Sequence, residues 1–225
     1  MGDFQPWQKE EAERAKKAAG PDRELGRIEA FSDGVFAVAI TLLILSVQLP
    51  PWSKLPLQDR LLQLWPEYVA YGVSFLTILV MWMNHHRLFS LAKRSNDWLL
   101  LTNGLLLLIV VFVPFPTAVL AANLMGPERQ TAVLFYAGTF VVLSLFFNLV
   151  RWCLTSKDGL VDRQADKHKI EGITRQYMVG PFMYLVAFFV AYGSPEASLV
   201  MNLLFALFFS VPGLTFAKQE PAEEE

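Results

Sequence analysis

The sequence has little charge and almost no cysteine. Of its 225 residues only 18% are charged and 54% are hydrophobic, whereas a soluble domain carries about 25% charged residues. The single cysteine, Cys153, excludes an intrachain disulfide and argues against a cysteine metal cluster. The formal net charge of −2 leaves no basic surplus, so we expect no nucleic-acid partner.

The motifs of common enzyme and metal sites are also missing. No G-x-S-x-G sequence is present, and that motif marks a nucleophilic serine. His85 and His86 are adjacent, and neighbours on a helix point ~100° apart, which is a poor geometry for holding one ion. The third histidine, His168, falls in a different polar segment. We therefore expect no enzyme activity, no metal site and no cofactor.

Six hydrophobic segments of roughly membrane-spanning length dominate the chain, because a bilayer core needs ~20 apolar residues in a helix. They fall near Ala30–Leu49, Pro66–Met83, Trp98–Leu120, Thr131–Val150, Ile173–Tyr192 and Ala197–Phe216. The sequence thus predicts an all-α integral membrane protein with six transmembrane helices. We divide it into a charged leader at 1–26, a transmembrane domain at 27–216 and an acidic tail at 217–225.

The basic residues predict the orientation of these segments. If the N-terminus is inside, the outward loops contain Lys54, Arg60 and Arg129, and all other lysines and arginines are inside. The positive-inside rule then puts both termini in the cytoplasm. No apolar region lies near Met1, so we expect no cleaved signal peptide and a multi-pass protein of the cell (inner) membrane.

The first segment, Arg27 to Leu49, is the one around which the chain is organised. An acid inside such a run is costly and suggests function, and Asp33 lies near its start, between Ser32 and Gly34. Further along, small, polar and branched apolar residues recur at helical spacing on one stripe. These residues are Gly34, Val38, Thr41, Leu45 and Gln48. A helix facing only lipid has no use for this mixture, whereas a helix lining a narrow water path does.

Three consecutive segments each place a polar side chain at the cytoplasmic boundary. Asp33 enters the first segment, His85 ends the second and Asn103 begins the third. A carboxylate near a helix N-terminus is favoured by the helix dipole, and histidine or asparagine can hydrogen-bond it. The residues suggest either a polar network that fixes the first helix or ordinary caps beside unrelated polar side chains.

The sequence resembles the transmembrane protein 175 family of potassium channels. The most specific match is the motif R-x-x-x-F-S-D, formed here by Arg27, Phe31, Ser32 and Asp33. Weaker matches follow at Trp82, His85, Arg87, Phe89, Asp97, Asn103, Pro114 and Phe115. The resemblance covers roughly the first half of the chain, to about Thr117. With a single set of six segments, the chain is similar to the prokaryotic branch of the family.

This resemblance implies a homotetramer around a central pore, with the polar network made by Arg27, Phe31, Ser32, Asp33, Trp82, His85 and Asn103. It also implies that the first helix lines the pore. Val38 and Leu45 would then form apolar rings around a hydroxyl ring at Thr41, with Gln48 at the outer mouth. Apolar constrictions can gate by dewetting.

No T-V-G-Y-G filter sequence is present, so selectivity would come from narrow apolar rings and hydroxyls. Because potassium loses its hydration shell at lower cost than sodium, we expect modest potassium selectivity, with potassium as the permeant ion. The expected partners are monovalent cations, the lipid bilayer and other copies of the same chain. The alternative is a proton-coupled secondary transporter that uses Asp33 and His85 as a relay.

Overall fold

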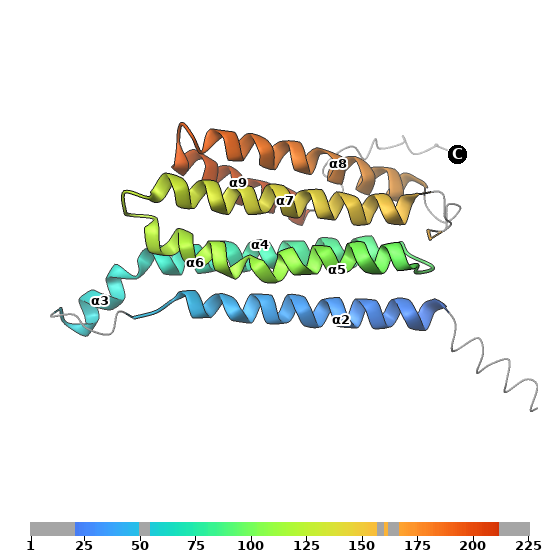
Figure 1. Ribbon diagram of the computed structural model, residues 1–225, viewed down its shortest axis with the longest axis horizontal. Coiled ribbons are helices and arrows are strands. Elements are labelled where there is room, and N and C mark those ends of the chain that lie inside the picture. Colours follow the sequence, from blue (N-terminus) through green and yellow to red (C-terminus); the bar gives the residue numbers. More distant parts are fainter. Residues whose placement is uncertain (1–20, 50–54, 157–159, 162–166, 212–225) are drawn as a thin grey trace, which may run out of the picture.

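The computed structural model describes residues 21–49, 55–156, 160–161 and 167–211, and these are predominantly helical. In chain order the elements are α2 (Pro21–Leu42), η1 (Leu43–Ser46), α3 (Leu57–Gln63), α4 (Trp65–Phe89), α5 (Asp97–Phe112), α6 (Pro114–Asn123), α7 (Arg129–Thr155), α8 (Lys167–Val190) and α9 (Pro195–Ser210). The long helices lie side by side in an elongated bundle (Figure 1). The prediction of an all-α fold is confirmed.

Four helical stretches in the described residues are long and apolar enough to cross a membrane. They are Glu24–Ser46, Trp65–Phe89, Asp97–Asn123 and Arg129–Thr155, and Pro195–Ser210 is a shorter apolar helix. The segment predicted near 173–192 lies largely in α8, and the one predicted at 197–216 is helical to Ser210, beyond which the described residues soon end. These stretches agree with a membrane protein.

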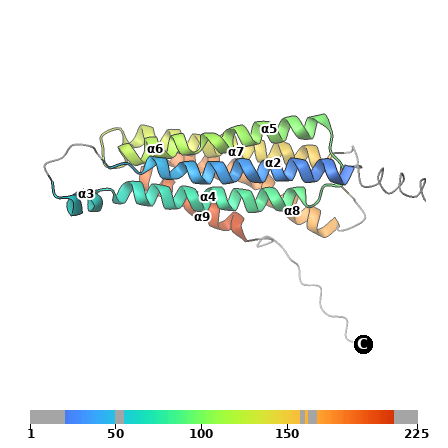
Figure 2. The same cartoon turned by 90° about the horizontal axis from the view of Figure 1, so that it is seen from below.

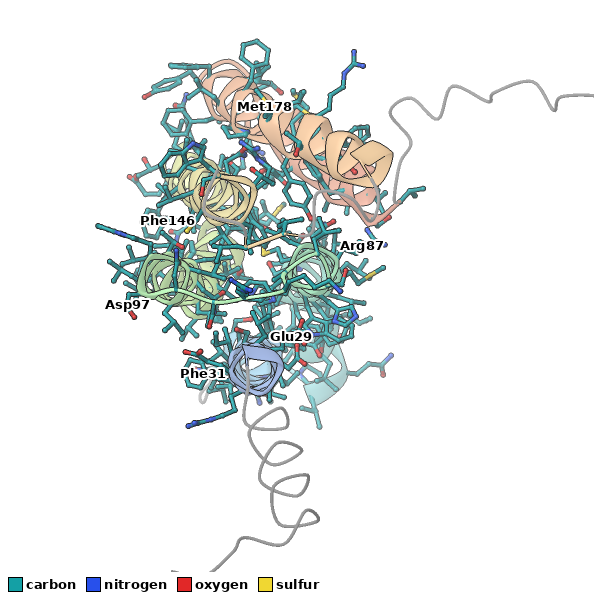
Figure 3. The ribbon with its side chains drawn as sticks, turned by 90° about the vertical axis from the view of Figure 1, so that its right-hand side faces the viewer. Glu29, Phe31, Arg87, Asp97, Phe146 and Met178 are labelled. Carbon is teal, nitrogen blue, oxygen red and sulfur yellow. The ribbon has the colours of Figure 1, made fainter. Side chains whose placement is uncertain are left out.

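The helices form successive layers. Viewed along the bundle, α2 lies at one edge, α4 and α5 come next, α7 follows, and α8 and α9 lie at the far edge (Figure 3). The contacts follow this order, because α2 packs on α4 and α5 while α7 packs on α5, α6, α8 and α9. Seen from below, α2 crosses the middle of the bundle and α3 projects beyond its end (Figure 2). Among the described residues, one side of α2 is therefore left uncovered.

Aromatic side chains fill the part of the core farthest from α2. Tyr136 packs edge-on against Phe140, with ring centroids 4.8 Å apart, and Phe140 stacks on Tyr184. Tyr184 also stacks on Phe209 of α9. Between helices in a bilayer the hydrophobic effect gives little driving force, so close packing of this kind and interhelical hydrogen bonds hold the bundle together.

Proline explains the break between α5 and α6. The sequence predicts a kink in the third hydrophobic segment from Pro114 and Pro116, and the structure confirms it. Proline lacks an N–H and its ring clashes with the preceding turn, so α5 ends at Phe112 and α6 begins with Pro114 at its first position. The two pieces together provide the 27-residue apolar stretch.

The boundaries of α2 differ from those predicted. The helix begins at Pro21, inside the range assigned to the charged leader, because proline suits the first helical position. The helical spacing predicted as far as Gln48 does not hold over the whole segment, since α-helical geometry ends at Leu42 and Leu43–Ser46 form a 3₁₀ turn. Pro50 restricts the residue before it to extended backbone, which opposes helix at this end. The acidic tail lies outside the described residues.

Candidate functional site

One face of α2 is buried against its neighbours. Its buried residues recur at intervals of three and four and are Leu25, Ile28, Ser32, Phe36, Ala39 and Leu43. This is the spacing of a single helix face, and the face packs on α4 and α5. The packing therefore sets the rotation of α2 about its own axis.

The opposite face of α2 is exposed and carries the stripe found in the sequence. At ~100° per residue, the step from Ser32 to Thr41 ends on the opposite side of the helix. Val38 and Leu45 on this face are 53% and 61% exposed. The remaining members, Gly34, Thr41 and Gln48, are exposed as well. Within the part of the chain that the structure describes, no helix packs over these residues.

The polar side chains of this exposed face bond to their own backbone. Thr41 Oγ1 donates to the carbonyl of Val38 over 2.9 Å, and Gln48 Nε2 donates to the carbonyl of Leu45 over 2.8 Å. The hydroxyl of Thr41 thus donates its hydrogen to the helix backbone, and its oxygen lone pairs remain free to accept. An exposed oxygen of this kind can replace water around a cation.

The 3₁₀ turn changes the far end of the stripe. Because Val47 is extended, Gln48 no longer follows the helical spacing from which its place was predicted. Ile44, which the sequence interpretation missed, is 52% exposed at this end of α2. An apolar residue in an apolar segment gives no signal of its own, so its exposure follows only from the packing.

Behind the exposed face, three side chains from three helices form a hydrogen-bonded chain. Asn103 Nδ2 donates to Ser32 Oγ over 3.0 Å, and Asn103 Oδ1 lies 2.8 Å from His85 Nε2. Ser32, His85 and Asn103 are 0%, 1% and 3% exposed. An amide oxygen accepts, so His85 Nε2 carries the hydrogen in this bond. The predicted meeting of these residues is therefore present in the structure.

His85 is also enclosed by aromatic rings. It stacks on Phe89 with ring centroids 4.3 Å apart and lies 5.3 Å from the ring of Phe36 on α2. These rings and the bond to Asn103 fix the imidazole in one orientation. The arrangement is suited to holding α2, α4 and α5 together.

Asp33 has a different partner from the one expected. The sequence suggested a bond from His85 or Asn103, but the indole Nε1 of Trp82 donates to Asp33 Oδ1 over 2.7 Å. Asp33 is one residue from Ser32, so it points ~100° away from the buried chain and toward the flank of α2 beside α4. Trp82 in turn stacks on the exposed ring of His86.

The other two motif residues lie outside these bonds. Phe31 is 66% exposed and Arg27 is also exposed. Phe31 and Glu29 lie on opposite flanks of α2 (Figure 3). The motif is thus divided in the single chain, with Ser32 facing inward, Asp33 facing one flank and Phe31 facing the other. No group of three potential metal-binding side chains occurs in the described ranges.

The sequence interpretation missed the polar contacts on the other side of α4. Arg87 Nη2 donates to the carbonyl of Ser210 over 2.9 Å, and Asn84 Nδ2 donates to the carbonyl of Phe209 over 3.0 Å. These groups cap the last carbonyls of α9, which have no partner within the helix. The end of α4 therefore contacts α2 on one side and α9 on the other.

The fold and this site define a helical membrane protein with one exposed, mixed-polarity helix face. The sequence profile of the family described as "Endosomal/lysosomal potassium channel TMEM175" matches residues 27–114. A potassium channel of Chamaesiphon minutus is 46% identical over 191 residues, which is 84% of this chain and 94% of that relative. The chain belongs to the TMEM175 family.

Two further comparisons agree. A potassium channel of Streptomyces collinus is 36% identical over 207 residues, covering 88% of this chain and 98% of the relative. The crystal structure of a lysosomal potassium-selective channel TMEM175 homolog from Chamaesiphon minutus matches with a TM-score of 0.78 and 43% identity, over 86% of this chain and 100% of that one. These relatives are named as channels, which confirms the prediction that the chain is not an enzyme.

Proposed function

We propose that this protein is a modestly selective potassium channel in which four copies surround a pore lined by α2. The observation that carries the proposal is the exposure of the stripe around Thr41, opposite the buried Ser32. A face of mixed small, apolar and hydroxyl side chains is costly to leave against lipid and useful around a water path. The relatives named as potassium channels support the same function.

In this arrangement each face residue occurs four times around the axis. Val38 and Leu45 supply apolar rings, Thr41 supplies hydroxyl oxygens between them, and Gln48 lies near the outer mouth. Apolar rings control wetting of the path, and the hydroxyls replace part of the hydration shell of a permeant potassium ion. No cofactor takes part.

We further propose six membrane spans per chain, both termini in the cytoplasm, and a place in the cell (inner) membrane. The small number of basic residues in the outward connections supports this orientation. The α4–α5 connection, the end of α7 and the start of α8 lie at one end of the bundle, and the α6–α7 and α8–α9 connections lie at the other (Figure 1). Successive long helices thus alternate in direction.

The contacts favour a channel over the proton-coupled transporter. Asp33 bonds to Trp82, whereas His85 bonds to Asn103 and is enclosed by Phe36 and Phe89. A relay between Asp33 and His85 would need the two groups to share a proton path. Their separate partners suit a structural role instead.

The test is reconstitution of the purified protein in planar bilayers with potassium on one side and sodium on the other. A channel of this kind passes current without a proton gradient, and its reversal potential shifts toward that of potassium. Cross-linking in the same membranes should give a tetramer as the largest species. Transport that requires a proton gradient, or a dimer as the largest species, would contradict the proposal.

A further inference from the structure

A small, partly open cavity lies between α4, α7, α8 and α9, away from the exposed face of α2. Its volume is about 50 Å³. A water molecule needs at least ~10–15 Å³ of such space, so there is room for water. The apolar part of the wall includes Met81, Leu143, Phe147 and Ala206, and its polar part includes Thr77, Ser144 and Tyr184.

Two hydroxyls in the wall have already donated their hydrogens. Thr77 Oγ1 donates to the carbonyl of Val73, and Ser144 Oγ donates to the carbonyl of Val141, both over 2.7 Å. Each oxygen retains lone pairs that can accept a hydrogen bond. These two positions can therefore accept a further hydrogen bond but cannot donate one.

The two asparagines that line the cavity have also donated their amide hydrogens to other groups. Asn84 Nδ2 donates to Val80 and Phe209, and Asn148 Nδ2 donates to Ser144 and Tyr177, in each case to a backbone carbonyl. Both hydrogens of each amide are thereby used. The two amide oxygens accept from the guanidinium groups of Arg87 and Arg151. These positive charges oppose a cation in the cavity.

Tyr184 is the exception in this wall. Its side chain lines the cavity and the residue is 8% exposed, yet its hydroxyl bonds to no residue in the part of the chain that the structure describes. A hydroxyl that lines such a cavity and has no protein partner is normally satisfied by ordered water. The Tyr184 hydroxyl therefore needs an acceptor.

We propose that this cavity binds an ordered water molecule that accepts from the Tyr184 hydroxyl and donates to Thr77 Oγ1 and Ser144 Oγ. Water supplies one acceptor and two donors to these groups, and three hydrogen bonds are typical of a buried water. The three residues belong to α8, α4 and α7. The water thus joins three helices, and this site is independent of the pore assignment.

Two more side-chain oxygens, at the interface between α4 and α9, also lack a hydrogen-bond partner among the described residues. Ser198 Oγ and Asn202 Oδ1 are buried and have no partner in the described residues. They lie on the same face of α9 as Ala206, which lines the cavity. The α4–α9 contact near Asn84 and Phe209 places Asn202 at about the level of Thr77, because the helices run in the same direction (Figure 1).

The sign of one stability change tests the proposal. In full-length protein in lipid nanodiscs, Tyr184→Phe should lower the unfolding temperature, by on the order of 2–4 °C, because the water loses its donor. If the cavity is dry, the same change removes an unpaired hydroxyl and should raise the unfolding temperature. Tyr136→Phe is the matched control, since the Tyr136 hydroxyl contacts Ser74 directly at 3.3 Å. That variant should be destabilised in either case.

A double-mutant cycle and a density map complete the test. Thr77→Val should destabilise the wild type more than it destabilises the Tyr184→Phe variant, since both changes act on one water. Strictly additive effects would overturn the proposal. A map at a resolution that shows ordered water should contain a peak within hydrogen-bonding distance of Tyr184, Thr77 and Ser144 in the wild type. An empty cavity there would also overturn it.

Discussion

Asn103 Nδ2 donates to Ser32 Oγ over 3.0 Å, and this bond ties the buried side of α2 to α5. Since Thr41 lies on the other side of the same helix, the bond also determines which residues α2 turns away from the protomer. The hydrogen-bonded chain is thus connected to the exposed stripe through the rotation of one helix. Substitutions on the buried face of α2 should therefore act mainly on stability, and substitutions on its exposed face should act mainly on permeation.

Replacing Asn103 with leucine should destabilise the protein by about 1–3 kcal/mol, because the buried Ser32 and His85 both lose a partner. Thermal unfolding in nanodiscs measures the loss of stability. Ion flux should fall in parallel, because α2 is no longer held at one rotation about its own axis. Asn123→Leu is the control, since Asn123 Nδ2 bonds to the carbonyl of Val119 in its own helix. Equal effects of the two changes would show that the contact between helices is unimportant.

Trp82→Phe removes the donor to Asp33 and should reduce both stability and flux. A hydrogen bond to a charged group contributes about 1.5–3 kcal/mol, and the loss of stability should be smaller because the exposed carboxylate is screened by solvent. Asp33→Asn keeps an oxygen acceptor for the indole, whereas Asp33→Leu does not. We therefore expect Asp33→Asn to be the milder of the two. A milder effect of Asp33→Leu, measured by unfolding and flux, would contradict the assigned bond.

Leu45→Ala should increase single-channel current with little loss of stability, because it removes apolar bulk from an exposed face and favours wetting of the path. The control is Leu43→Ala, at a fully buried position two residues away. That change should cost about 2–5 kcal/mol in unfolding and leave the conductance of the remaining folded channels unchanged. The reverse pattern would place Leu43, not Leu45, on the pore.

Thr41→Val preserves the shape of the side chain and deletes its hydroxyl oxygen. It should lower the preference for potassium over sodium, read from the bi-ionic reversal potential, with little change in unfolding. Thr102→Val is the matched control, because Thr102 also bonds to its own helix but is buried on α5. An unchanged reversal potential for Thr41→Val would remove this residue from the permeation path.

Cysteine labelling tests the orientation in the membrane. In a Cys153→Ser background, Glu128→Cys should react with a membrane-impermeant reagent from outside intact cells, and Ser90→Cys should react only after the membrane is opened. Both positions are exposed and lie in or beside connections at opposite ends of the bundle. Labelling of both from outside would contradict the proposed topology.

The apolar segments, the kink at Pro114 and the membrane class could all be predicted from the sequence. Each depends on a local property, such as the length of an apolar run or the missing N–H of proline. The spacing of Val38, Thr41 and Leu45 likewise predicted a common helix face. The pore role of that face stays a prediction, because the single chain has no other copy against it.

Only the tertiary structure decided how the polar residues are partnered. Asp33, His85 and Asn103 were predicted to lie at one level, but hydrogen bonds between helices depend on their rotations and register, which local sequence does not encode. Packing turns Ser32 toward Asn103, so that Asp33 accepts a hydrogen bond from Trp82 instead. For the same reason the unpartnered hydroxyl of Tyr184 appears only once α4, α7 and α8 are packed around it.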